Sequence, residues 1–178
     1  MANRNEALER LLDRRSVKAY RPDAVPQELL DEILAAGMNA PTGMNRQSPI
    51  ILAVTDRKVR DELSRRNAAA MGMSGVDPFY GAPAVLVVLA RKDVVTHVYD
   101  GSLVLGQMLV AAHSLGLGAC WIHRAKEVFE SSWGRELLRS LGVEGEYEGI
   151  GHCIVGYPDG PLPAARPRKE NYVYYIKG

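Results

Sequence analysis

Hydrophobic residues recur at helical spacing in several parts of the chain. Three leucines between residues 8 and 12 predict a first helix, which ends near Arg14. A second helix is predicted in VPQELLDEILAAG, with Pro26 in its first turn and Gly37 at its end. Further helices are predicted in RKVRDELSRRNAAAM and in RELLRSL.

Four apolar segments predict β-strands, namely IILAVT, AVLVVLA, GACWIH and GIGHCIVGY. The unbroken run in AVLVVLA is typical of a strand whose sheet is covered on both faces. The segment 71–83, rich in Gly and Met, is predicted to be a mobile loop. Met71, Met73, Phe79 and Tyr80 in this loop are candidates to line a tolerant pocket, although simple loop packing explains them equally well.

Two segments are too apolar or too extended to be explained by one chain alone. The helix expected over residues 99–115 carries apolar side chains on nearly every side, so we expect a partner subunit to cover its far face. The tail after YPDGPLP is rich in proline but ends in NYVYYI, which alternates like a strand. We expect this C-terminal arm, about residues 157–178, to wrap the partner.

Composition narrows the class of protein. The 178 residues are 47% hydrophobic, which fits one domain over residues 1–178. With 22 basic and 21 acidic residues, no overall field favours nucleic acid or an anionic membrane. Two cysteines are too few for a disulfide framework, and the charged N-terminal segment MANRNEALERLLDRRS lacks the apolar core of a signal peptide. We therefore expect a cytoplasmic location.

Basic residues cluster near both ends of the chain, although neither a P-loop nor a Rossmann glycine pattern is present. Arginine can instead hold a phosphate with its planar fork of N–H donors. In RRSVKAY, an extended backbone would place Ser16 and Lys18 on one face, beside Arg14 and Arg15. The alternative is that these arginines only complement a helix C-terminus. Arg166 and Arg168 alternate in the tail in the same way.

Two further groups of residues suggest chemistry. Cys120, His123, His152 and Cys153 have zinc-ligand side chains, but on strands the members of each pair face opposite sides, so we expect no metal site. The loop APTGMNRQSP gathers hydroxyl and amide groups that suit the polar edge of a planar heterocycle, although a plain loop has the same composition.

Together these segments resemble the FMN-dependent nitroreductase family, in the form of its compact, anaerobe-type branch. RRSVKAY, followed by a helix and the loop PTGMNRQ, is similar to the N-terminal signature of that family. GAPAVLVVLA, LVAAHSLGLGACWIH and GYPDGPLPAARPRKENYV are similar to its later segments, in the same order. The resemblance implies an α+β, nitroreductase-like fold: a central mixed β-sheet flanked by helices in an intertwined homodimer, with FMN sites at the interface.

The resemblance also implies roles for individual residues. Lys18 would lie near the flavin N1–C2=O edge, and a cation there would stabilise the reduced state. His123 replaces the Glu or Gly of many relatives, which leaves the role of its side chain open. The phosphate would be held by Arg14, Arg15, Ser16, Arg166 and Arg168. The flavin ring would be contacted by a loop of the other subunit that contains Pro41, Thr42, Asn45 and Gln47. Flavin N5 would lie close to backbone N–H groups of the strand residues Trp121, Ile122 and His123.

The implied activity is transfer of electrons from NAD(P)H to nitroaromatic, quinone or similar acceptors by a ping-pong mechanism. No protein acid or nucleophile is then needed. Two alternatives remain open: another reductive reaction at the same FMN site, such as dehalogenation or flavin fragmentation, and a flavin-binding protein without turnover.

Overall fold

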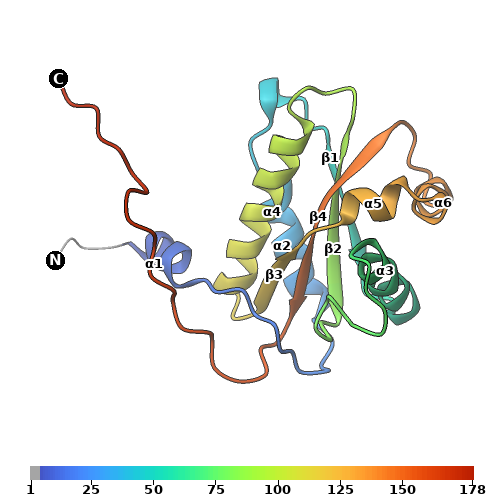
Figure 1. Ribbon diagram of the computed structural model, residues 1–178, viewed down its shortest axis with the longest axis horizontal. Helices are drawn as coiled ribbons and strands as arrows, with labels where there is room; N and C mark the ends of the chain where they lie inside the picture. The colour runs from blue at the N-terminus through green and yellow to red at the C-terminus, as the bar shows by residue number, and fades with distance from the viewer. Residues whose placement is uncertain (1–4) are drawn as a thin grey trace.

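A computed structural model describes residues 5–178 of the chain (Figure 1). The first four residues of the charged N-terminal segment lie outside the described part. The elements in chain order are α1 (Glu6–Asp13), α2 (Gln27–Met38), the short 3₁₀ helix η1 (Gly43–Asn45), β1 (Pro49–Val54), α3 (Arg57–Ala70), β2 (Ala84–Arg91), α4 (His97–Ser114), β3 (Gly118–Ile122), α5 (Ala125–Glu130), α6 (Ser132–Ser140) and β4 (Tyr147–Gly156).

The predicted strands are confirmed, and they form a sheet in the order β1-β2-β4-β3. All three strand pairs are antiparallel. The parallel pairing expected of a mixed sheet is limited, in the described residues, to an isolated bridge between Ser16 and Ala119. The last strand in sequence, β4, occupies an inner position and therefore joins β2 to β3.

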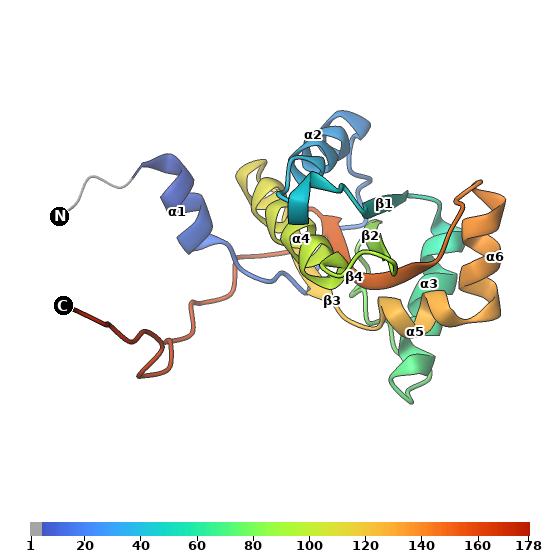
Figure 2. The same ribbon diagram turned by 90° about the horizontal axis from the view of Figure 1, so that it is seen from above.

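Helices cover both faces of the sheet, and α2 and α4 lie on the face opposite α3, α5 and α6 (Figures 1 and 2). Because side chains alternate along a strand, β2 supplies both layers of the core. Leu86 and Val88 pack in the layer that holds Met108 of α4, whereas Val85 and Val87 pack in the layer that holds Leu63 of α3. Burial on both faces explains the unbroken apolar run of β2.

The end of α2 differs from the sequence prediction. Gly37 lies inside the helix, which continues to Met38. A Cβ atom at Gly37 would lie 2.8 Å from Cγ of Met108. Close packing between α2 and α4, rather than helix termination, therefore explains this glycine. The helix α5 was not predicted.

Three segments leave apolar side chains uncovered. In α4, Leu103 is 48% exposed and Tyr99 is 73% exposed. The helix α1 has no buried residue, and the tail from residue 159 onward is exposed throughout. Both α1 and the tail extend from the same side of the body (Figures 1 and 2). Over residues 5–178, no helix has the length and hydrophobicity needed to cross a membrane.

Candidate cofactor site

The basic N-terminal segment lies between β3 and the start of the C-terminal tail. The N–H of Val17 donates to the carbonyl oxygen of Ala119 at 3.1 Å. The N–H of Arg21 donates to the carbonyl oxygen of Tyr157, and the N–H of Asp159 donates to that of Ala19. Residues 17–21 therefore contact first the open edge of β3 and then the segment that leads from β4 into the C-terminal tail.

Side chains in this segment alternate as the sequence predicted. Val17 is buried, whereas Ser16 and Lys18 on either side of it are exposed and line the same cavity. A Cβ atom at Gly118 would lie 2.9 Å from the side chain of Val17, so glycine is required for the segment to approach the strand this closely. The prediction that Ser16 and Lys18 share a face is confirmed.

A cavity of about 540 Å³ lies at this edge of the sheet. The ammonium of Lys18 lies over the ring of Tyr80, 5.5 Å from its centroid. Trp121 and His123 also line the cavity, and their rings lie 5.6 Å apart. Polar, cationic and aromatic groups thus converge here, and the lining residues are Ser16, Lys18, Asn67, Met71, Pro78, Tyr80, Cys120, Trp121, Ile122, His123 and Arg124.

The electrostatics of the cavity favour an anion. Burial raises the pKa of the Cys120 thiol, whereas a hydrogen bond with Ser16 and the positive charges of Lys18 and Arg14 oppose that rise. These two cations are therefore close enough to act on a group in the cavity wall. The cysteine itself stays a neutral thiol at pH 7.

The loop over residues 71–83 forms one wall of the cavity, and a carboxylate fixes its shape. Asp77 accepts hydrogen bonds from Arg60 at 2.5 Å and from Ser64 at 2.5 Å, as well as from two backbone N–H groups of its own loop. Met71 and Tyr80 reach the cavity, as the sequence suggested, but Phe79 is fully buried and Met73 lines a different cavity. Tyr80 has a φ of 52°, a left-handed conformation that the Asp77 hydrogen bonds stabilise.

The loop PTGMNRQ lies elsewhere in the same chain. Met44, Asn45 and Gln47 all have positive φ values between 48° and 53°. Non-glycine residues in this region cost roughly 1 kcal/mol or more each, and such strain is concentrated at functional sites. Within the loop, Gln47 donates from its backbone N–H to Oγ1 of Thr42 at 3.0 Å and from its amide to Oδ1 of Asn45 at 3.2 Å.

The buried carboxylate of Asp100 anchors this strained loop. It accepts from the N–H of Gly43 at 2.9 Å, from the hydroxyl of Thr96 at 2.9 Å and from the hydroxyl of Ser48 at 3.4 Å. Asp100 lies in the first turn of α4, where a negative charge also stabilises the helix N-terminus. Its contacts with the loop were not predicted, because 57 residues separate it from Gly43.

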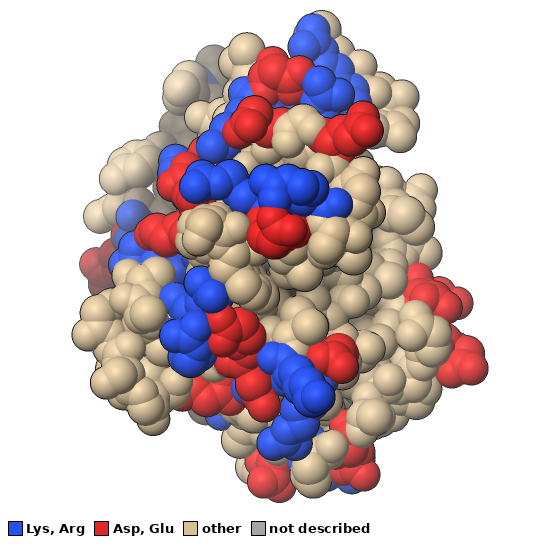
Figure 3. Space-filling model, turned by 90° about the vertical axis from the view of Figure 1, so that its right-hand side faces the viewer, with Lys and Arg blue, Asp and Glu red and all other residues tan. Residues whose placement is uncertain are grey.

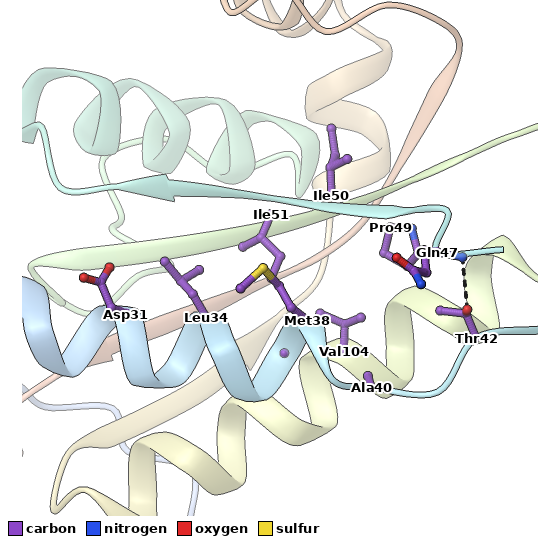
Figure 4. A pocket seen from close by; sticks show the side chains of 11 residues that line it. Asp31, Leu34, Met38, Ala40, Thr42, Gln47, Pro49, Ile50, Ile51 and Val104 are labelled. Atoms are coloured by element: carbon purple, nitrogen blue, oxygen red, sulfur yellow. Dashed lines mark hydrogen bonds between the residues drawn. The ribbon is translucent and has the colours of Figure 1, made fainter. Parts of the chain in front are cut away.

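Thr42 and Gln47 lie at one end of a larger cavity of about 630 Å³, between α2 and β1 (Figure 4). The rest of its wall is mostly apolar, with Leu34, Met38 and Ile51 among the lining residues. Among residues 5–178, Asp31 is the one charged residue that lines it. A negative charge disfavours phosphate, so the smaller cavity beside Lys18 is the better anion site.

The predicted site residues therefore form separate groups within one chain. Ser16, Lys18 and the strand residues 121–123 share one cavity, and the loop over residues 41–47 lies beside another. Arg166 and Arg168 are on the exposed tail, outside both cavities. The cysteines face opposite layers of the core, Cys120 in one and Cys153 in the other.

Elsewhere on the surface, charges of both signs are interspersed. The face that carries α3 and α6 shows acidic and basic side chains side by side (Figure 3). Many are paired within one helix, such as Arg65 with Glu62 and Arg139 with Glu136. This face offers no extended patch of one sign, in agreement with the balanced composition.

Known proteins with similar sequences indicate the family to which the chain belongs. The sequence model of the Nitroreductase family matches residues 11–79 and 68–157. FMN reductase (NAD(P)H) of Bacillus subtilis strain 168 is 29% identical over 186 residues, covering 92% of this chain and 70% of that protein. This chain spans 60% of the length of another curated relative.

Solved structures match over nearly the whole chain. A nitroreductase with bound FMN from Bacteroides fragilis superposes with a TM-score of 0.88 at 28% identity, covering 98% of this chain and 100% of that one. Oxidized iodotyrosine deiodinase bound to FMN and 3-iodo-L-tyrosine superposes with a TM-score of 0.73 at 25% identity, covering 96% of this chain and 99% of that one.

Proposed function

Because this chain belongs to the Nitroreductase family, we propose that it is an FMN-dependent oxidoreductase that takes electrons from NAD(P)H. The proposed acceptors are nitroaromatics, quinones or similar compounds, reached by a ping-pong mechanism. One observation carries the proposal: Ser16 and Lys18 share a cavity with the strand residues Trp121, Ile122 and His123. The names of the relatives, which include an FMN reductase and an FMN-bound nitroreductase, support the same cofactor.

The residues of the cavity fit FMN. The hydroxyl of Ser16 in the cavity and the positive charge of Arg14 close to its wall suit a terminal phosphate. The guanidinium of Arg15 donates to the carbonyl oxygens of Leu12 and Arg14 in this chain, so Arg15, like the exposed Arg166 and Arg168, would have to reorient to reach that phosphate. Lys18 supplies a fixed positive charge for the electron-rich N1–C2=O edge. When bound, FMN supplies the redox chemistry, which the side chains that line the cavity do not provide. The chain's own work is to bind, orient and tune the cofactor.

The separation of the site residues supports an interface site. One chain keeps Thr42, Asn45 and Gln47 beside a different cavity from Ser16 and Lys18. We propose that a second copy brings its loop over residues 41–47 to this cavity, so that two FMN sites form in a homodimer. The uncovered apolar residues of α1, α4 and the C-terminal arm supply surface for such a dimer. The arm over residues 157–178 then wraps the partner.

The two half-reactions test the proposed activity. Under anaerobic conditions, NADH or NADPH should bleach the flavin absorbance of the purified protein, and menadione or a nitrofuran should then restore it. Initial rates measured with both substrates varied should give parallel double-reciprocal lines. A flavin that neither nucleotide reduces would contradict the proposal and favour a binding protein without turnover. Cell fractionation tests the predicted cytoplasmic location separately.

The deiodinase neighbour makes reductive dehalogenation a specific second candidate. Its structure holds FMN and 3-iodo-L-tyrosine, and it matches nearly the whole chain. Product analysis distinguishes the two activities: release of iodide from 3-iodotyrosine would favour dehalogenation, and amine or hydroxylamine products from a nitroaromatic would favour nitroreduction.

We expect Lys18→Met to lower the reduction potential of the bound FMN. The substitution removes a positive charge at the cavity wall but leaves Ser16 and the arginines in place. For a two-electron couple, each shift of about 30 mV corresponds to about 1.4 kcal/mol of lost stabilisation of the reduced state. The measurement is equilibration against a redox dye, with Lys58→Met on the exposed surface of α3 as a matched control. Equal potentials for both variants, with FMN bound, would place Lys18 away from the ring.

A further inference from the structure

The backbone at the end of β3 is held from inside the protein by two buried polar side chains. The amide nitrogen of Asn67, on α3, donates to the carbonyl oxygen of His123 at 2.7 Å. Nδ1 of His152, on β4, lies 3.3 Å from the carbonyl oxygen of Ile122. Both side chains are completely buried. The candidate site as described so far assigns no role to His152, and Asn67 enters it only as one of the residues that line the cavity.

Peptide geometry links these contacts to the cavity. In a planar trans peptide, the C=O and the N–H point in opposite directions. The carbonyl of Ile122 is directed toward β4, so the N–H of His123, in the same peptide, is directed away from it. In the same way, the carbonyl of His123 is directed toward Asn67, so the N–H of Arg124 is directed away from α3.

The strand pattern agrees with this orientation. The carbonyl of Ala119 faces the open edge of β3, where it accepts from Val17. Backbone groups alternate along a strand, so the N–H groups of Trp121 and His123 face the same edge. That edge is where the cavity lies. Within residues 5–178, the N–H groups of His123 and Arg124 donate to no other backbone group.

The conformation at this point is costly, which argues for a role beyond packing. Arg124 has a φ of 77°, in the left-handed region that favours glycine. Oδ1 of Asn67 and Nε2 of His152 are buried without a hydrogen-bond partner. Unpaired buried polar atoms reduce stability, and two of them beside one turn call for an explanation.

The state of His152 is compatible with donation to the strand. Burial lowers the pKa of His152 to about 4, so the ring is neutral at pH 7. A neutral imidazole has one N–H donor and one acceptor nitrogen. Donation from Nδ1 to the carbonyl of Ile122 leaves Nε2 as the acceptor, which is the atom without a partner.

We propose that Asn67 and His152 are positioning residues that turn the backbone N–H groups of His123 and Arg124 toward the flavin ring. By drawing these two carbonyls inward, they leave the N–H groups of the same two peptides facing the cavity. This inference rests on the proposed function for the identity of the ligand. A donor pair at this point complements N5 of oxidised flavin, which is an acceptor, better than it complements reduced flavin, where N5 carries a hydrogen.

The test compares Asn67→Leu and His152→Leu with Leu63→Val, a change of one buried apolar side chain of α3 that removes no hydrogen bond. In the FMN-loaded protein, we expect the first two variants to shift the equilibrium between oxidised and reduced FMN about tenfold toward reduced. This corresponds to a potential about 30 mV higher. Leu63→Val should lower the melting temperature without moving the potential.

A second readout does not require the cofactor. In FMN-free protein, the NMR chemical shifts of the backbone amides of His123 and Arg124 should change in Asn67→Leu and remain unchanged in Leu63→Val. Unmoved resonances, or unchanged potentials in both leucine variants with full FMN content, would overturn the inference. A wild-type protein that binds no FMN would contradict the proposed function instead. The amide resonances would still decide whether Asn67 orients the strand.

Discussion

A heterodimer of one Arg14→Ala subunit and one Asn45→Ala subunit should recover about half of the wild-type activity, although each variant homodimer is nearly inactive. In the proposed interface site, each FMN takes Arg14 from one chain and Asn45 from the other. One of the two sites then receives both lesions and the other receives neither. If the sites act independently, the intact site keeps its full rate. The measurement is activity per FMN in co-expressed, separately tagged heterodimers.

A matched control comes from two lesions on the same side of the site. In a heterodimer of Arg14→Ala with Ser16→Ala, every site carries one lesion, so no activity should return. If both residues of the first pair served the same chain's flavin, the two heterodimers would behave alike. That result would reject the interface site, together with the explanation given for the uncovered face of α4.

Asp77→Ala should cost about 2 kcal/mol of unfolding free energy and release the loop that carries Tyr80. The substitution leaves the guanidinium of Arg60, whose side chain is 9% exposed, without its shortest ion pair. Breaking one half of a buried pair costs about 3–5 kcal/mol, but Asp77 is partly exposed and Asp61 also contacts Arg60, which reduces the loss. Urea unfolding measures the loss, and Asp61→Ala is the control.

Protonation of the Asp77 carboxylate should also destabilise the folded protein in acid. Burial alone would raise the pKa of Asp77, but hydrogen bonds from Arg60, Ser64 and two backbone N–H groups bring it below its ordinary value of 3.8. A carboxylate with a lowered pKa in the folded state stabilises the protein fully above that ordinary value, and the stabilisation is lost as the pH falls below it. Asp77→Ala should therefore flatten the acid limb of the stability curve. Equal stability of the Asp77 and Asp61 variants would contradict this role.

Local patterns in the sequence were sufficient to predict the strands and the face shared by Ser16 and Lys18. Both depend on alternation or on apolar runs within a few residues. The order of the strands was not predictable in this way, because β4 pairs with β2 and β3 across long separations in the chain.

Local sequence patterns also could not predict the residues that support the site. Asp100 anchors a loop 57 residues away, and Asn67 holds a carbonyl 56 residues away. Asn67 lies in a segment that reads as an ordinary polar helix, and its role depends on the packing of α3 against the end of β3. The strained loop, and the buried amide of Asn67 with only its nitrogen hydrogen-bonded, can be recognised only in the three-dimensional structure.

The most direct test of the central claim is the absorbance spectrum of the purified protein, followed by identification of the flavin that acid releases. We expect a yellow protein that releases FMN, because the arginines and Ser16 suit a terminal phosphate and the sequence contains no glycine turn of the kind that binds an AMP moiety. Release of FAD, or a colourless protein that takes up no added FMN, would contradict it.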